Sequence, residues 1–239
     1  MASRGALIFR QLFDRTCCGY SYLIGDRAQK VALLIDPVLE QVDRDLKLVE
    51  QLGLELRYVL NTHVHADHIT GSGLIKNRLN LENNSKVISI ISKSSGAQAD
   101  ICAEDGQVID CGLIKLNVSF TPGHTNGCMS LIDHDNKRAF TGDTLFIRGC
   151  GRTDFQEGSS SKLYDSVHSR LFILPDDYNV YPAHDYNGQL TSTIGEEKKF
   201  NPRLSKSREE FIQIMENLNL DYPKMMDVAV PKNMICGGT

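Results

Sequence analysis

The chain of 239 residues has no tryptophan, which excludes little, and no cluster of lysine and arginine, which excludes more. Its formal net charge is −4. Proteins that bind nucleic acid or anionic membranes need clustered cations, so we expect neither among the partners. No apolar run reaches the roughly 18 residues that a membrane-spanning helix needs. These absences favour a globular protein that acts on small molecules.

The sequence also lacks any Cys-x-x-Cys pair, although it contains seven cysteines. Their number is odd, and the first two are adjacent, at positions 17 and 18. This pattern does not predict a disulfide framework or a thiolate zinc site. We expect a reducing intracellular compartment, in which most of these cysteines are small core residues.

Local patterns predict a mixture of strands and helices. Strands are expected within residues 20–26, 30–37, 56–63, 86–92, 114–124 and 178–185, and a hairpin within 127–143. Helices are expected in the stripe from Val42 to Leu52, after the serines at 159–161, and after Ser207, which forms a capping-box pattern with Glu210. The last 20 residues, with Pro223 and Pro231, are expected to be extended. Mixed elements in this order favour layers in which helices cover sheets.

Metal-binding side chains follow four of the expected strands. The strand ends lead to His63, His124, Asp143 and His184. Ligands at strand ends share one rim of a sheet structure, where rigid elements hold them in place. The first belongs to a dense cluster, His63-x-His65-x-Asp67-His68. Histidine and carboxylate ligands suit zinc, iron or manganese, so the sequence predicts a metal site at this rim.

The strings "HVHADH", "TPGHT", "TGD" and "PAHD" resemble the metallo-β-lactamase superfamily. This resemblance implies an α+β fold, an αββα sandwich of two mixed β-sheets flanked by helices. We expect a single domain over residues 1–239, with a short C-terminal extension from about residue 190. The superfamily includes hydrolases, nucleases and oxygenases, so the shared motif does not identify the reaction.

Longer strings narrow the choice. "NTHVHADHITGSG", "FTGDTLFIRGCGRTDFQEGSS", "YPAHDYNG", "NPRL" and "VAVPKNMICG" resemble the persulfide dioxygenases over nearly the whole chain. This family implies the oxidation of glutathione persulfide by O2 and water to sulfite and glutathione. It implies one Fe(II) per chain, held by His63, His124 and Asp143, and no organic cofactor. Two histidines and one carboxylate on one face of an octahedron leave three positions for water, substrate and oxygen.

The other side chains near this rim receive supporting roles. His65, Asp67, His68, Thr125 and His184 are expected to surround the ligands and to orient them or move protons.

Arg152 is our candidate for binding a glutathione carboxylate, because a planar guanidinium suits that group. The alternative for Arg152 is a structural ion pair with Asp154. Tyr186 is expected either to face the substrate pocket or to lie on the surface.

Two alternative functions remain open. The first is a hydroxyacylglutathione hydrolase (glyoxalase II) with two zinc ions, which uses metal-activated hydroxide. Its ligands would be His63, His65 and His124 for one metal, Asp67, His68 and His184 for the other, and Asp143 between them. Only about 50 residues follow His184, with one clear helix, and that hydrolase resemblance would call for a larger helical domain. The second alternative is a non-catalytic sulfur carrier that uses Cys236, near Lys232.

The resemblance also implies the mitochondrial matrix and is compatible with a homodimer. The N-terminal stretch "MASRGALIFRQLF" has two arginines and no acidic residue, as mitochondrial presequences do, but it is too short to be a convincing one. A cytoplasmic location therefore stays open at this point.

Overall fold

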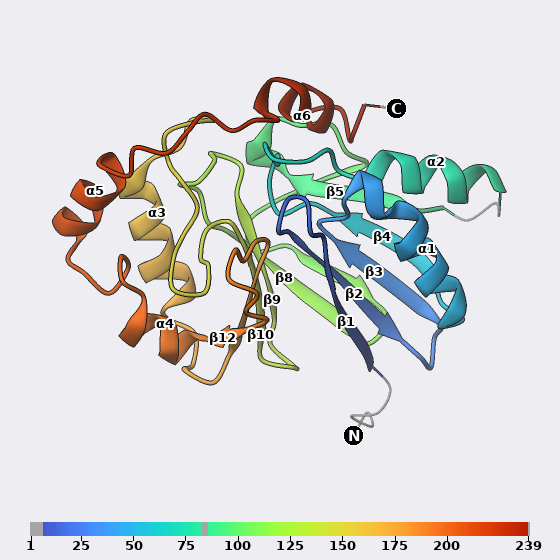
Figure 1. The fold of residues 1–239 in the computed structure, drawn as a ribbon. Helices are drawn as coiled ribbons and strands as arrows, with labels where there is room; N and C mark the ends of the chain where they lie inside the picture. The colour runs from blue at the N-terminus through green and yellow to red at the C-terminus, as the bar shows by residue number, and fades with distance from the viewer. Residues whose placement is uncertain (1–6, 83–85, 239) are drawn as a thin grey trace.

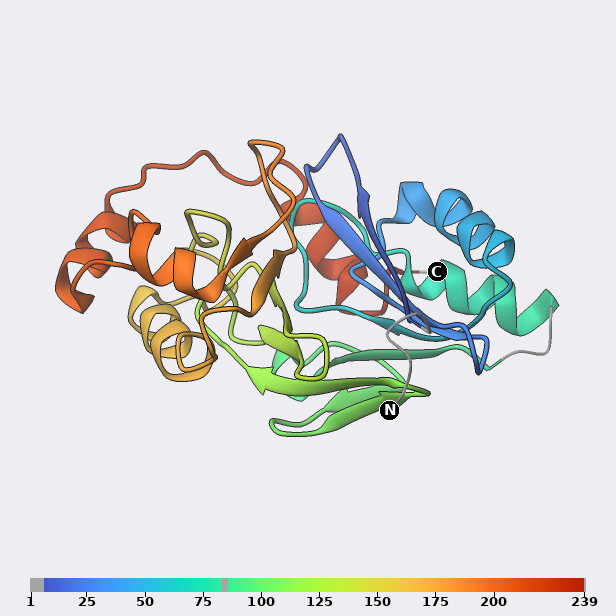
Figure 2. The same ribbon diagram turned by 90° about the horizontal axis from the view of Figure 1, so that it is seen from below.

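Two six-stranded β-sheets pack face to face in the computed structural model, which describes residues 7–82 and 86–238 (Figure 1). Helices cover the outer faces of both sheets, so the layers run helix, sheet, sheet, helix (Figure 2). The α+β sandwich of two mixed sheets that the sequence predicted is confirmed. The first six residues, which include part of the N-terminal stretch, lie outside the described residues.

The first sheet follows the chain order. Its strands are β1 (Leu7–Phe13), β2 (Tyr20–Asp26), β3 (Val31–Ile35), β4 (Glu55–Leu60), β5 (Ile88–Ser92) and β6 (Ile101–Ala103). The first three pair antiparallel, and β3 to β6 pair parallel. Every residue of β2 and β3 is buried, because these strands are covered on both faces.

The second sheet has the order β12-β11-β10-β9-β8-β7. Its strands are β7 (Val108–Cys111), β8 (Ile114–Phe120), β9 (Met129–Asp133), β10 (Arg138–Gly142), β11 (Asn179–Pro182) and β12 (Ser192–Thr193). Only β10 and β11 pair parallel. The predicted hairpin is β9 and β10, and its turn includes Asp135 and Asn136.

Three apolar clusters hold the layers together. Between the sheets, aromatic and aliphatic side chains such as Tyr22, Ile24, Leu131 and Phe140 interdigitate. On the outer face of the first sheet lie α1 (Val42–Gln51) and α2 (Ser72–Glu82). On the outer face of the second sheet lie α3 (Ser160–Ser166), its π-helical continuation Val167–Leu171, α4 (Ile194–Phe200) and α5 (Arg208–Glu216). Two short 3-10 turns, Leu39–Gln41 and Lys93–Ser95, complete the elements of the described residues.

The C-terminal segment differs from its predicted extended form. Residues Met226–Asn233 form helix α6, although Pro231 lies inside it. Its Val230 and Met234 pack against Val64, Ile91 and Ala97 in a fourth apolar cluster. Tertiary packing therefore outweighs the low helix propensity of proline.

The segment after His184 therefore contains three helices, α4, α5 and α6, rather than the one that the sequence indicated. The sequence argument against the hydrolase used the presence of only one clear helix after His184. With three helices there, that argument is weaker. The helices pack onto the sandwich, and the single-domain interpretation with an extension from about residue 190 stays a prediction. None of the helices in the described part of the chain has both the length and the apolar character needed to cross a bilayer.

Candidate metal centre

Both sheets contribute side chains to one rim of the sandwich. His63 follows β4 of the first sheet, while His124, Asp143 and His184 follow β8, β10 and β11 of the second. The two sheets approach each other closely here, as Gly142 shows. Its φ is 54°, and a Cβ on it would lie 2.8 Å from Oγ1 of Thr62. A larger residue would push the ligands apart, so glycine is needed at this position.

Three donor atoms converge at the rim. Oδ2 of Asp143 lies 3.7 Å from Nε2 of His63 and 3.5 Å from Nε2 of His124. The ligand atoms of these three residues all lie within 4.8 Å of one another. The structure therefore brings together the ligand set that the family resemblance implied.

Hydrogen bonds orient both histidines toward the site. Nδ1 of His63 donates to Oγ1 of Thr62 at 3.0 Å, because that hydroxyl donates its own proton to Asp36. Nδ1 of His124 donates to the carbonyl oxygen of Arg152 at 2.7 Å. Each ring then has its proton on Nδ1 and its lone pair on Nε2, the tautomer that a metal ligand needs.

Charge and burial favour the protonation states of metal ligands. Burial, together with the neighbouring His65, holds the pKa of His63 well below its usual range, so the ring is neutral. Burial alone would raise the pKa of Asp143, but the nearby His184 and His63 outweigh it and lower that pKa. The site thus offers the neutral nitrogen of His63 and the carboxylate of Asp143.

A metal ion fits this donor set. Nε2 of His63 is buried and has no hydrogen-bond partner. A buried polar atom without a partner is costly, and a cation at the convergence point would satisfy it. The two-histidine, one-carboxylate set is typical of a metal with open coordination positions.

The second histidine of the cluster is bonded to a buried carboxylate. Nε2 of His65 donates to Oδ1 of Asp36 at 3.0 Å, and its Nδ1 has no hydrogen-bond partner. Asp36 also accepts from the backbone N–H of Thr62 at 2.7 Å. Asp36 therefore holds both the first and the second histidine of the cluster in place, a role that the sequence analysis missed.

His184 is bonded to carboxylates on both sides. Its Nδ1 lies 2.7 Å from Oδ1 of Asp143, and its Nε2 lies 2.8 Å from Oδ2 of Asp67. Burial opposes its charge, but the two carboxylates outweigh burial and raise the pKa of His184 well above its usual range. In this arrangement both ring nitrogens of His184 are therefore engaged by carboxylates.

Asn233 of α6 is a second residue that the sequence analysis missed. Its side-chain oxygen accepts from the backbone N–H of Thr70 at 2.8 Å. Its amide nitrogen donates to the carbonyl oxygens of His65 and His68 at 2.9 and 2.8 Å. The C-terminal helix therefore clamps the loop that carries the histidine cluster. No local pattern around position 233 could have indicated this contact.

Arg152, the residue predicted to bind a glutathione carboxylate, is paired with a neighbouring side chain in the structure. The guanidinium of Arg152 forms a two-pronged ion pair with Asp154, with both distances 2.7 Å, and also donates to the carbonyl oxygens of Leu220 and Asp221. The structure thus shows the structural ion pair that the sequence left open, and the donors needed for a carboxylate clamp are occupied. The clamp role of Arg152 stays a prediction, and it would require the substrate carboxylate to replace Asp154 at the guanidinium.

Tyr186 and Thr125 border the site without bonding to the ligands. Tyr186 is 67% exposed, and its ring lies parallel to that of His184 with centroids 6.1 Å apart. The hydroxyl of Thr125 accepts from the backbone N–H of Gly127 and contacts Sγ of Cys128, so it shapes the turn after His124.

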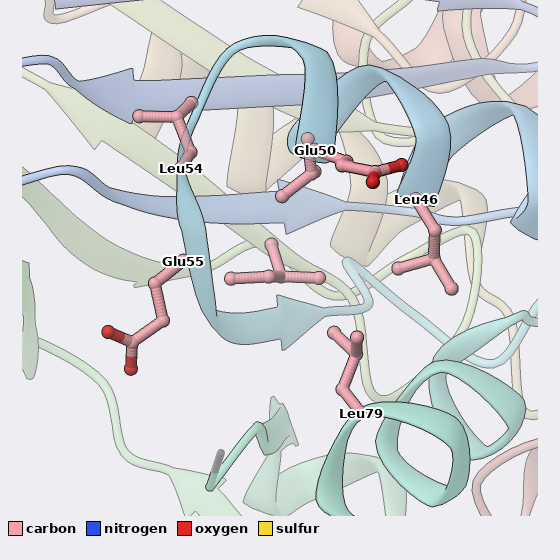
Figure 3. A pocket seen from close by; sticks show the side chains of 7 residues that line it. Leu46, Glu50, Leu54, Glu55 and Leu79 are labelled. Atoms are coloured by element: carbon pink, nitrogen blue, oxygen red, sulfur yellow. The ribbon is translucent and has the colours of Figure 1, made fainter. Parts of the chain in front are cut away.

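Two cavities are available for ligands. The first has a volume of about 400 Å³. It adjoins the metal site, because two of its lining residues, Val64 and Thr125, directly follow His63 and His124 in the sequence. Its other lining residues are Ser94, Ser95, Gly96, Asn126, Gly127, Gln156, Glu157, Val230 and Met234. The other, of about 300 Å³, is a mostly apolar pocket between α1, β4 and α2 (Figure 3). No residue next to a candidate metal ligand lines the second cavity, so the first is the better candidate for the substrate.

Comparisons with known proteins agree with this site. The family model of the metallo-beta-lactamase superfamily matches residues 15–83 and 85–184. The mitochondrial persulfide dioxygenase ETHE1 of Homo sapiens is 52% identical over 235 residues, which cover 98% of this chain and 91% of that protein. The crystal structure of ETHE1 from Myxococcus xanthus matches with a TM-score of 0.89 and 52% identity, covering 96% of this chain and 99% of that one.

A hydrolase is also similar, but over less of the chain. The hydroxyacylglutathione hydrolase GloC of Haemophilus influenzae is 33% identical over 193 residues, which cover 74% of this chain and 89% of that protein. The similarity to the persulfide dioxygenases is higher and extends through the C-terminal helices.

Proposed function

Because this chain belongs to the persulfide dioxygenases of the metallo-β-lactamase superfamily, we propose that it oxidises glutathione persulfide with O2 and water to sulfite and glutathione. The chain is an oxidoreductase of the dioxygenase class. Glutathione as the carrier of the sulfur and iron as the metal are the specific parts of this proposal.

One observation carries the proposal: three ligands converge while the fourth candidate is engaged elsewhere. His63, His124 and Asp143 share one metal position, and both nitrogens of His184 are bonded to carboxylates. Three protein ligands leave room for a sulfur substrate and O2 at the same metal. We therefore propose one iron per chain and no organic cofactor.

The iron would supply the redox coupling between sulfur and O2, and the protein supplies binding, orientation and charge. Oδ1 of Asp143 accepts from His184, which turns Oδ2 toward the two histidine ligands. His184 in turn donates to Asp67, which is partly exposed to solvent. This series of three residues gives protons released during sulfite formation a route from the site to solvent.

We propose that the cavity beside the ligands holds the glutathione part of the substrate. Glu157 is the one charged residue that lines it. Gln156 and Glu157 both have a positive φ, 49° and 57°, and Gln156 donates to the carbonyl oxygen of Val64 at 2.8 Å. Strained backbone of this kind occurs where a binding site needs a fixed geometry. The carboxylate of Glu157 suits the ammonium group of glutathione.

Replacing Glu157 by glutamine is expected to raise KM for glutathione persulfide about two- to fivefold and to leave kcat unchanged. An exposed ion pair contributes about 0.2–1 kcal/mol, and the ammonium group is remote from the reacting sulfur. Steady-state oxygen uptake over a range of substrate concentrations measures both constants.

Glu50→Gln is the matched control, because Glu50 lines the other cavity and should leave KM unchanged. A fall in kcat at constant KM for Glu157→Gln, or the same effect from Glu50→Gln, would remove Glu157 from the proposed binding site.

The activity itself is tested by supplying the purified protein with glutathione persulfide or with a hydroxyacyl thioester of glutathione. We expect oxygen uptake with equimolar sulfite from the first and little hydrolysis of the second. Fast thioester hydrolysis without oxygen uptake would support the hydrolase alternative instead.

The family resemblance has two further implications, which concern the compartment and the oligomeric state of the enzyme. The mammalian relatives are mitochondrial by name, and we propose the mitochondrial matrix for this chain. A homodimer stays a prediction. The non-catalytic carrier that uses Cys236 gains no support, since the metal ligands are assembled as the dioxygenase requires.

A further inference from the structure

A rigid turn places Cys17 beside the metal site. The turn joins β1 to β2, and the side chain of Asp14 accepts from the backbone N–H groups of Thr16 and Cys17 at 2.9 Å. The same segment is tied to the strand end that carries His184, through backbone hydrogen bonds from Tyr20 to Ala183 and from Asp185 to Cys18. The position of Cys17 is therefore set by the fold.

Glycine at position 19 lets the thiol and His184 approach each other. A Cβ there would lie 2.9 Å from Sγ of Cys17 and 3.5 Å from Nε2 of His184. Sγ of Cys17 also belongs to a cluster with Asp67, His68 and His184, whose ligand atoms all lie within 4.8 Å of one another. Cys17 is partly exposed, so a small molecule can reach it.

His68 lies in the same cluster as this thiol and can exchange a proton with it. It is only 6% exposed, and its Nδ1 donates to Oδ2 of Asp67 at 3.0 Å. Its Nε2 is buried and has no hydrogen-bond partner. The series Asp67, His68, Cys17 therefore has an orienting carboxylate, a histidine with an unused nitrogen, and a thiol nucleophile.

The charge at His68 fits the same role. Burial opposes the charged form, but Asp67 and Cys17 outweigh it and raise the pKa of His68 to about 10. This imidazolium can return a proton to a leaving thiolate. Burial raises the pKa of Cys128 to about 12 and those of Cys111 and Cys150 to about 11, so these buried thiols are poor nucleophiles.

We propose that Cys17 is a sulfur-accepting nucleophile, which takes the outer sulfur of a persulfide and gives this enzyme a second activity, sulfur transfer between thiols. The proposal shares its substrate class with the proposed function. The thiolate of Cys17 attacks the outer sulfur of the persulfide, and a new S–S bond forms as the old one breaks. The leaving thiolate takes the proton that His68 had received from Cys17. The products are Cys17 persulfide and a free thiol, with no net oxidation.

A second thiol can then attack the outer sulfur of Cys17 persulfide, which restores Cys17 and yields a new persulfide. His184 separates this nucleophile from the metal ligand Asp143, because it bonds to Asp143 on one side and to Asp67 on the other. Sulfur transfer at Cys17 and persulfide oxidation at the metal site would therefore use the same substrate at neighbouring positions. Only the oxidation would need O2.

The test is to incubate the full-length protein with glutathione persulfide without O2 and to locate the added sulfur by mass spectrometry of the intact chain and its peptides. We expect one added sulfur atom on Cys17. It should be retained in Cys18→Ser, the matched control at the adjacent thiol, and lost in Cys17→Ser. His68→Asn should slow the labelling at least about tenfold, because positioned acid–base groups contribute about 10²–10⁴ in rate.

Oxygen uptake measured on the same samples separates this proposal from the proposed function. Unlabelled Cys17 in protein that consumes oxygen would overturn the nucleophile and leave the dioxygenase intact. Labelled Cys17 in protein that consumes no oxygen would support the nucleophile and count against the dioxygenase. Sulfur on Cys18 instead of Cys17 would also overturn the proposal. Zinc that the wild-type protein binds and the Cys17→Ser variant loses would overturn it too, because the cluster would then be a metal site.

Discussion

Replacing His63 by alanine is expected to remove the metal from the protein and to abolish oxygen uptake with glutathione persulfide. His63 supplies one of three ligands from a buried position, and two ligands are too few to hold the ion against water. Metal content per chain and oxygen uptake, measured on the same preparation, give the result.

His65→Ala is a closely matched control. Both histidines are 1% exposed, and their ring centroids lie 4.0 Å apart. His65 donates to Asp36, and we propose that it acts on the metal only through its neighbours. Its loss should then lower the metal affinity by about 10–100-fold at most. With excess iron the His65→Ala protein should still be loaded. Equal loss of metal from the two variants would mean that His65 is a ligand, as the hydrolase alternative requires.

Replacing Asp36 by alanine is expected to lower the free energy of unfolding by about 3–5 kcal/mol, because it leaves buried donors without their acceptor. The carboxylate accepts from the N–H and hydroxyl of Thr62 and from Nε2 of His65. Iron affinity should also fall, because the Thr62 hydroxyl would be free to donate to Nδ1 of His63 and would favour the wrong tautomer. Urea unfolding and iron titration measure the two effects.

Asp36→Asn serves as the control. Asp36 has a φ of 49°, a conformation that asparagine tolerates better than alanine, and the amide keeps one acceptor oxygen. We expect it to lose clearly less stability than the alanine variant. A loss below about 1 kcal/mol for both variants would show that the three hydrogen bonds do not hold the ligand loop in place.

The strands and the ligands that follow them could be predicted because their signals are local. A run such as "YSYLIGD" is apolar enough to be recognised as a buried strand, and β2 matches it residue for residue. The capping box of Ser207 and Glu210 is likewise complete within four residues, and the structure contains it. His63, His124 and Asp143 each follow a recognisable strand, so a shared rim was a sound expectation.

Elements without strong periodicity could not be found in this way. The apolar residues of α2 do not form a regular stripe, and its N-terminal Ser72 is held by contacts with Thr70 and Asn61. Helix α6 contains a proline and depends on packing against a loop more than 160 positions earlier, as the contact from Asn233 to His65 shows.

The remaining roles depend on contacts that the folded structure shows and the sequence does not. Arg152 could have bound either substrate or Asp154 on its sequence alone, and only the fold shows that Asp154 holds it. The juxtaposition of Cys17 with His68 joins two segments 51 positions apart, and neither segment carries a motif that points to the other. Both segments adjoin strands of the first sheet, so this pairing depends on the fold of that sheet.

The central claim is that one metal ion is held by His63, His124 and Asp143. Elemental analysis of the purified wild-type protein, loaded with iron and then dialysed, tests it most directly. We predict one iron per chain and no zinc needed for activity. Two metal ions per chain, with zinc preferred over iron, would contradict the three-ligand site and favour the dinuclear hydrolase.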